Sequence, residues 1–195
     1  MTVTQAGPRQ GGAGRVRGGI VTRLVTIAIA LAVLAIPARA FAMPQPVAGG
    51  TIRVNASVGK VRIGLPRAAV VQRIGDPVER YSDDDWSWDG TRTTFGLVFD
   101  RDRVARISIA GGARFCIRAR VCTGSRGGVG YLRRRFGSRL RFFEAEDGTR
   151  AAIVTGRLGG RKVFTIFGDL SSRRSTGKFR TVLLGDCRRG LTRPC

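Results

Sequence analysis

Two stretches of the chain share an order of elements that limits what it can fold into. Residues 63–77 read IGLPRAAVVQRIGDP and residues 126–140 read RGGVGYLRRRFGSRL. In each stretch apolar residues recur three or four apart, which is typical of one face of a helix. Pro66 suits the first turn of the first helix, and Gly75 and Gly137 are placed to end the two helices. We therefore expect two short helices, each with a single apolar face.

Runs of β-branched and aromatic residues, separated by Asp/Gly turns, follow each helix and predict antiparallel strands. These runs are residues 86–88, 93–99 and 104–109 after the first helix, and 140–145, 151–155, 163–167 and 179–184 after the second. A sheet of three or four strands cannot bury its own face, so we expect the two units to share a sheet or pack side by side. The predicted fold class is α+β: a tandem repeat of a short helix followed by an antiparallel β-meander, with the two repeats packed together.

The N-terminal segment has the three parts of a secretory signal peptide. Four arginines and no acid precede the apolar run LVTIAIALAVLAI at residues 24–36, and small residues follow it. We expect cleavage after Ala40 or Ala42, and favour Ala42 because no arginine then lies beside the scissile bond. The alternative is an uncleaved membrane anchor, although thirteen residues span only about 20 Å of helix against a hydrocarbon core of roughly 30 Å.

The predicted organisation has four parts and places the protein outside the cell or in its envelope. The parts are a signal peptide at residues 1–42, a flexible Pro/Gly-rich linker at 43–50, a first helix-plus-sheet repeat at 51–115 and a second, strongly basic repeat at 116–195. Four cysteines lie in the exported part, and an even number in an oxidising compartment favours disulfides. We expect local pairing of Cys116 with Cys122 and of Cys187 with Cys195, rather than a four-thiolate zinc site.

The chain is strongly basic, with 35 Lys+Arg against 13 Asp+Glu and a formal net charge of +22. Residues 43–112 carry a net charge of +2, whereas residues 113–195 carry +15. The candidate anion-binding residues cluster in this second part: Arg126, Arg133, Arg134, Arg135, Arg139 and Arg141. Such a patch suits an anionic wall polymer or lipid headgroups, and export makes these better candidates than nucleic acid. A solvated cationic surface without a ligand is the other interpretation.

The glycine-rich loop at residues 123–128 leads into the second predicted helix and could offer backbone N–H groups to an anion. It matches neither a P-loop nor a dinucleotide fingerprint, so a flexible turn into the helix is the alternative.

The segment from Tyr81 to Asp89 joins both tryptophans of the chain to four aspartates. Aromatic side chains beside carboxylates are typical of protein-binding patches. The candidate partner-binding residues are Tyr81, Asp84, Asp85, Trp86 and Trp88. A calcium site and a buried tryptophan pair behind a polar turn are the alternatives.

Catalysis is not expected. The chain has no histidine, which excludes Ser-His and Cys-His nucleophile pairs. A hydrolase with two carboxylates would have to combine Glu144 or Asp147 with one of residues 83–85, and nothing in the sequence favours this. We expect no metal and no cofactor.

The string GLPRAAVVQRIGDP, followed by an aromatic strand and FDRDRVARISI, resembles the tandem β-lactamase-inhibitor-protein family and the related small outer-membrane assembly lipoproteins. The resemblance implies a non-catalytic fold whose concave, aromatic-lined sheet binds another protein, with Trp86 and Trp88 at its rim. The lipoproteins' lipid-attachment cysteine is missing here. We therefore expect a secreted binding protein that holds a protein partner on a sheet face, or else an envelope-associated protein that binds a polyanion through its arginines.

Overall fold

Strands make up most of the molecule. The computed structural model describes residues 47, 49–90, 93–111 and 114–187, all within a unit that spans Ala42–Cys195. The strands are β1 Gly50–Arg53, β2 Ser57–Val58, β3 Val61–Arg62, β4 Glu79–Arg80, β5 Asp85–Gly90, β6 Thr93–Asp100, β7 Arg103–Gly111, β8 Phe115–Arg118, β9 Val121–Cys122, β10 Leu140–Glu144, β11 Arg150–Leu158, β12 Arg161–Gly168 and β13 Thr181–Asp186. The helices are α2 Arg67–Ile74 and α3 Gly128–Phe136, with a 3₁₀ turn η1 at Gly137–Arg139.

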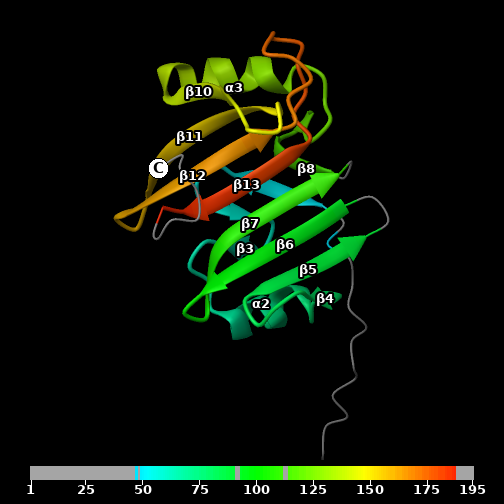
Figure 1. Cartoon of the computed structure of the whole chain (residues 1–195), viewed down its shortest axis with the longest axis vertical. Helices are drawn as coiled ribbons and strands as arrows, with labels where there is room; N and C mark the ends of the chain where they lie inside the picture. Colours follow the sequence, from blue (N-terminus) through cyan, green and yellow to red (C-terminus); the bar gives the residue numbers. More distant parts are fainter. Residues whose placement is uncertain (1–46, 48, 91–92, 112–113, 188–195) are drawn as a thin grey trace, which may run out of the picture. The chain divides into compact units, whose positions relative to one another are not determined.

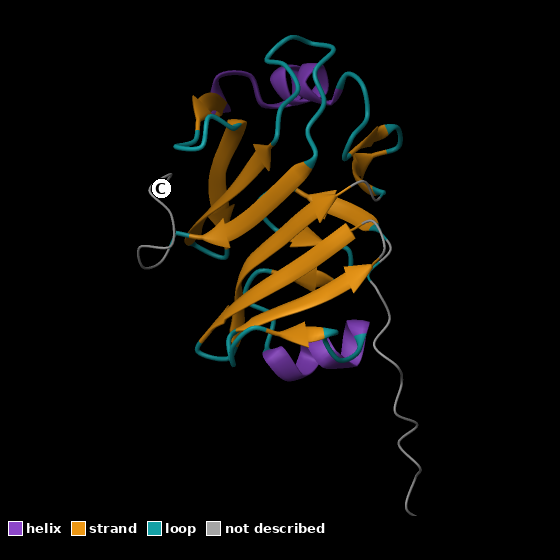
Figure 2. Ribbon diagram, turned by 45° about the vertical axis from the view of Figure 1, so that its right-hand side comes forward, coloured by secondary structure: helices purple, strands orange, loops and turns teal. Residues whose placement is uncertain are grey.

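The strands form two sheets. The larger sheet has eight strands in the order β10-β11-β12-β13-β7-β6-β5-β4, and every pairing in it is antiparallel. The smaller sheet has the order β3-β2-β1-β8-β9, and β1 pairs with β8 in parallel. In Figure 1 the smaller sheet lies behind the larger one, and Figure 2 shows the same arrangement after a 45° turn.

The predicted fold class is wrong. The described residues contain thirteen strands in two sheets and only two short α-helices, so the fold is β-rich and is not a repeat of a helix plus a meander. The physical reason is that a second sheet of five short strands packs on the core side of the larger sheet. The smaller sheet draws its strands from residues 50–62 and 115–122, where the runs are too short for a pattern to predict them.

Both helices lie where their sequences predict them. The N–H of Gly75 donates to the carbonyl of Val71 at 2.8 Å, and Gly75 has a φ of 81°, the left-handed region that glycine favours. Gly137 ends α3 with a φ of 51°. The apolar faces that these helices bury include Val70 from α2 and Leu132 from α3.

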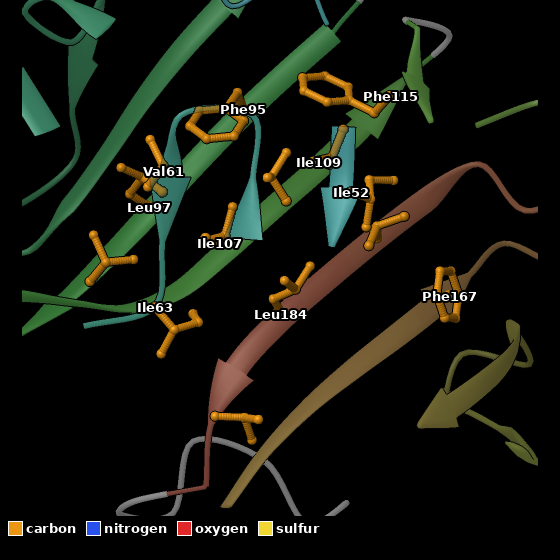
Figure 3. Packing of buried hydrophobic residues seen from close by; sticks show 14 of the residues in the cluster. Ile52, Val61, Ile63, Phe95, Leu97, Ile107, Ile109, Phe115, Phe167 and Leu184 are labelled. Atoms are coloured by element: carbon orange, nitrogen blue, oxygen red, sulfur yellow. The ribbon is translucent and has the colours of Figure 1, made fainter. Parts of the chain in front are cut away.

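The core fills the space between the two sheets. Figure 3 shows Ile52 and Val61 of the smaller sheet, and Ile63 just after it, directed toward apolar side chains of the larger sheet. The larger sheet contributes Phe95, Leu97, Ile107, Ile109, Phe167 and Leu184 to this layer. A polar contact crosses the same layer, because Thr165 of β12 bonds to Asn55 in the β1–β2 turn. The core therefore depends on residues that lie far apart in the sequence.

The predicted signal peptide and most of the predicted linker lie outside the described residues. Two linker residues that the structure does describe belong to the folded unit: Val47 packs against the core, and Gly50 is the first residue of β1. Among the described residues, no helix is long and apolar enough to cross a membrane.

Candidate binding surfaces

The two tryptophans lie in the core. Side chains alternate along β5, so Trp86 and Trp88 point to the same side of the sheet, which is the core side. Trp88 is fully buried, and its indole N–H donates to the carbonyl of Gly75 at 3.3 Å. Trp86 keeps 5% of its surface exposed. These side chains attach α2 to the sheet, so a protein partner could not reach Trp88 without unfolding this region.

Two arginines and Phe99 surround Trp86. The guanidinium carbons of Arg67 and Arg80 lie 5.1 Å and 4.7 Å from the centroid of its ring, and Phe99 packs edge-on at 4.8 Å. Arg67 also forms ion pairs with Asp84 at 2.5 Å and with Asp102 at 3.1 Å. Asp84, predicted to bind a partner, is therefore engaged within the molecule.

Tyr81 and Asp85 lie differently from the tryptophans. Asp85 pairs with Val98 across β5 and β6, and both alternate with core residues, so they belong to the side of the sheet that faces away from the core. Tyr81 is 65% exposed. A hydrogen bond with the Glu79 carboxylate raises the pKa of the Tyr81 phenol above its usual 10.0, and a weaker opposing effect comes from Ser87. The predicted partner site is thus divided between the two sides of the sheet.

The side of the eight-stranded sheet opposite the core is named here the open face, since the smaller sheet covers the other side (Figures 1 and 2). The strand register aligns one row of its residues from β11 to β4: Ile153, Ile166, Leu183, Ser108, Gly96, Ser87 and Glu79. The neighbouring row contains Thr155, Phe164, Gly185, Arg106, Val98 and Asp85. Of these residues only Asp85 was predicted to bind a partner, although the alternation of the others with core positions is visible in each strand.

On the open face, side chains of neighbouring strands lie over three glycines. The ring of Phe164 lies over Gly185, where it leaves no room for a Cβ, and Phe164 is only 1% exposed. Ser108 similarly covers Gly96, and Thr181 covers Gly168. These glycines therefore let side chains of the neighbouring strands lie close to the backbone.

Charge is unevenly distributed over the open face. The β10–β12 end carries Arg141, Arg157 and Lys162, which line a hollow of about 280 Å³ together with Thr155, Gly156 and Cys187. The β4–β5 end carries acidic residues instead: Glu79, Asp85 and Asp89. One end is therefore basic and the other acidic, and the half-buried Ile166, Leu183 and Val98 lie between them together with Arg106 and small residues.

The predicted arginines are not all in one place, because Arg133 and Arg141 line different hollows. All six arginines are exposed, but their contacts differ. Arg141 belongs to the open face, Arg139 lies 5.9 Å from the ring of Phe136, and Arg133 lies 4.6 Å from the ring of Phe142. Arg133 lines a large hollow beside α3 with Arg150, Arg173 and Arg174, which the sequence analysis did not single out.

The glycine-rich loop before α3 is occupied by the chain itself. The N–H groups of Gly127, Val129 and Gly130 donate to the carbonyls of Thr176, Gly177 and Ser175, at 3.3, 3.1 and 3.1 Å. A Cβ at Gly130 would approach the Ser175 carbonyl to 2.6 Å, so glycine is needed for this contact. These amides hold the β12–β13 loop and are not available to an anion.

The disulfide between Cys116 and Cys122 is present, as expected, and joins two directly opposed residues of β8 and β9. This bond contradicts a four-thiolate zinc site. Cys187 also takes part in a disulfide, and its predicted partner Cys195 lies outside the described residues. Among the described residues there is no group of three or more His, Cys, Asp or Glu side chains that could hold a metal ion.

The carboxylates considered for hydrolysis are not brought together. Glu144 ends β10 at one edge of the larger sheet, whereas Asp85 lies in β5, next to the opposite edge. The backbone N–H of Thr149 donates to Asp147 at 2.8 Å, and this bond lowers the pKa of that carboxyl below its usual 3.8. Asp147 therefore acts as a turn residue.

Comparison with known proteins adds little to this description. No family model matches the chain, and no curated protein matches it. A crystal structure of a cysteine-rich secretory protein from Staphylococcus aureus subsp. aureus Mu50 is similar at 11% identity and a TM-score of 0.37. That match covers 63% of this chain and 44% of the other, so the chain spans less than half the length of that protein.

Proposed function

We propose that this is an exported, non-catalytic binding protein that holds a protein partner on its open face. The observation that carries the proposal is the composition of this surface: half-buried apolar side chains lie between a basic and an acidic end. Small ligands bind in enclosed hollows of roughly 300–1,000 Å³, and the hollow at the basic end of this face is smaller, at about 280 Å³. The partner expected here has an apolar patch flanked by charges of the opposite order.

Several features of the described residues support this proposal. Ile166, Leu183 and Val98 are half-buried, so they retain apolar surface that a partner could cover. Tyr81 adds an exposed aromatic ring at the acidic end. These residues replace Trp86 and Trp88 as the expected contact residues, because the tryptophans are buried.

The test begins with affinity capture by the full chain from the host's secreted and envelope fractions, at low and moderate salt. A discrete protein retained at both salts is expected. The double variant Arg157→Glu/Lys162→Glu reverses the charge of two residues that are cross-strand partners at the basic end of the open face. It should weaken capture by about tenfold, since complementary charges both steer and hold a partner.

The matched control is Arg53→Glu/Arg62→Glu, which reverses two exposed arginines on the smaller sheet with the same change in net charge. It should leave capture within about twofold, because charges far from the interface are screened. Equal losses in the two variants would contradict the proposal, as would retention of only polymer or lipid that disappears when salt is raised.

The exported state is part of the same proposal and has its own test. The N-terminal pattern favours removal of residues 1–42. Mass spectrometry of material from the culture medium or envelope should give a mature protein that begins at Met43 or, after cleavage at Ala40, at Phe41. An intact Met1 in secreted material would contradict cleavage.

A further inference from the structure

An open hollow of about 790 Å³ lies beside α3 and shares no residue with the open face. Three segments that are distant in sequence line it: Arg133 from α3, Glu144 and Arg150 from the adjoining ends of β10 and β11, and Ser172, Arg173, Arg174 and Ser175 from the β12–β13 loop. Four arginines therefore line one hollow, and Glu144 is the one acidic residue among its lining residues. We name this site the arginine hollow.

The arginines of the hollow are held on a fixed frame. The side chain of Arg133 donates to the carbonyl of Arg173 at 2.9 Å and stacks on Phe142, so its guanidinium is anchored on two sides. The hydroxyl of Ser172 accepts the N–H of Arg174 at 3.0 Å. The three amides at the start of α3 hold the loop from below, as described above. A ligand would meet an arrangement that is already formed, which lowers the entropic cost of binding.

The positive charge of the hollow is poorly compensated within the chain. The one ion pair is between Arg173 and Glu144, at 4.0 Å and with both side chains about half exposed. Within the described part of the chain, no ion pair is found for Arg133, Arg150 or Arg174. Four like charges in one hollow repel each other, and an anion placed among them would remove that repulsion.

We propose that the arginine hollow binds the phosphate group of an anionic ligand. Guanidinium and hydroxyl groups supply many hydrogen-bond donors, and a phosphate group accepts such bonds through several oxygens without needing to donate. The planar fork of arginine matches two phosphate oxygens at once. The phosphate could belong to a lipid headgroup or be free in solution, and both carry the same chemistry. This site is separate from the proposed protein-binding surface and does not depend on it.

The experiment measures binding of the full chain to inorganic phosphate by calorimetry, and to phosphatidylcholine vesicles containing phosphatidylglycerol by co-sedimentation. The variants are Arg174→Gln and Arg150→Gln, whose side chains are exposed and make none of the loop's backbone hydrogen bonds. Each should weaken binding by about tenfold or more, the loss expected for one charge-assisted contact. Arg133 is left unchanged because its side chain supports the loop.

The matched control is Arg134→Gln, which removes the same charge from α3 at an exposed position that does not line the hollow. It should leave affinity within about twofold, because a diffuse surface charge is screened by salt. Saturable binding of free phosphate alone identifies a small anion as the ligand, and binding of the vesicles identifies a headgroup. Absence of saturable binding to both probes would overturn the proposal, as would equal losses in Arg134→Gln and Arg174→Gln.

Discussion

At the scale of single residues, the contact between Asn55 and Thr165 links the two sheets. The hydroxyl of the fully buried Thr165 accepts the N–H of Asn55 at 2.7 Å and donates to its Oδ1 at 2.8 Å. Thr165→Val leaves both Asn55 groups unpaired, so the free energy of unfolding should fall by about 1–3 kcal/mol in urea denaturation. The control is Thr155→Val, because Thr155 of β11 is exposed on the open face. It should change the free energy of unfolding by less than about 0.5 kcal/mol. Equal effects would contradict this account.

A second residue-scale prediction concerns the pKa of Tyr81. The Glu79 carboxylate accepts the phenol proton in a hydrogen bond and repels the phenolate, so the protonated form is favoured. The corresponding stabilisation is complete below pH 10 and is lost as the pH rises through the raised pKa. Glu79→Gln should lower the pKa toward 10.0, measured by absorbance titration in a Tyr131→Phe background. An unchanged or higher pKa would show that Glu79 does not hold this proton.

At the scale of elements, the Cys116–Cys122 disulfide secures the short β8–β9 hairpin. Strand β8 carries the fully buried Phe115 and pairs with β1, so the bond supports the centre of the smaller sheet. Closing a loop with a sequence separation of 6 should contribute about 2 kcal/mol, which Cys116→Ser/Cys122→Ser would remove. Hydrogen exchange should accelerate in β1, β8 and β9 before β11 and β12. An unaltered unfolding midpoint would contradict this role.

At the scale of the whole molecule, the pairing of β7 with β13 makes the larger sheet a single body. Two independent repeats would unfold in separate steps, whereas one continuous sheet and one shared core should unfold in a single transition. Both tryptophans lie in β5 and report on the first half, while circular dichroism reports on all strands. The two signals should give the same denaturation midpoint. Midpoints that differ beyond error would show that the halves unfold separately.

The local structure was largely predictable. The spacing of apolar residues and the glycines that end the helices predicted α2 and α3. The runs of β-branched residues predicted most strands of the larger sheet. The smaller sheet was missed, because strands of two residues such as β2 and β3 leave no detectable alternation. For the tryptophans the sequence left a partner-binding surface and a buried pair both open, because a sequence cannot show which side of a strand is covered, and the structure has the buried pair.

By itself, then, the sequence determined the short helices, the longer strands, the local disulfide and the excess of positive charge in the second half. These features depend on residues that are close in the sequence, so they can be predicted from composition and spacing. Only the tertiary structure decided that β7 meets β13, that Trp88 is buried, and that Arg133, Arg150 and Arg174 line one hollow. Contacts between residues distant in sequence arise from packing of whole sheets, and no local pattern encodes them.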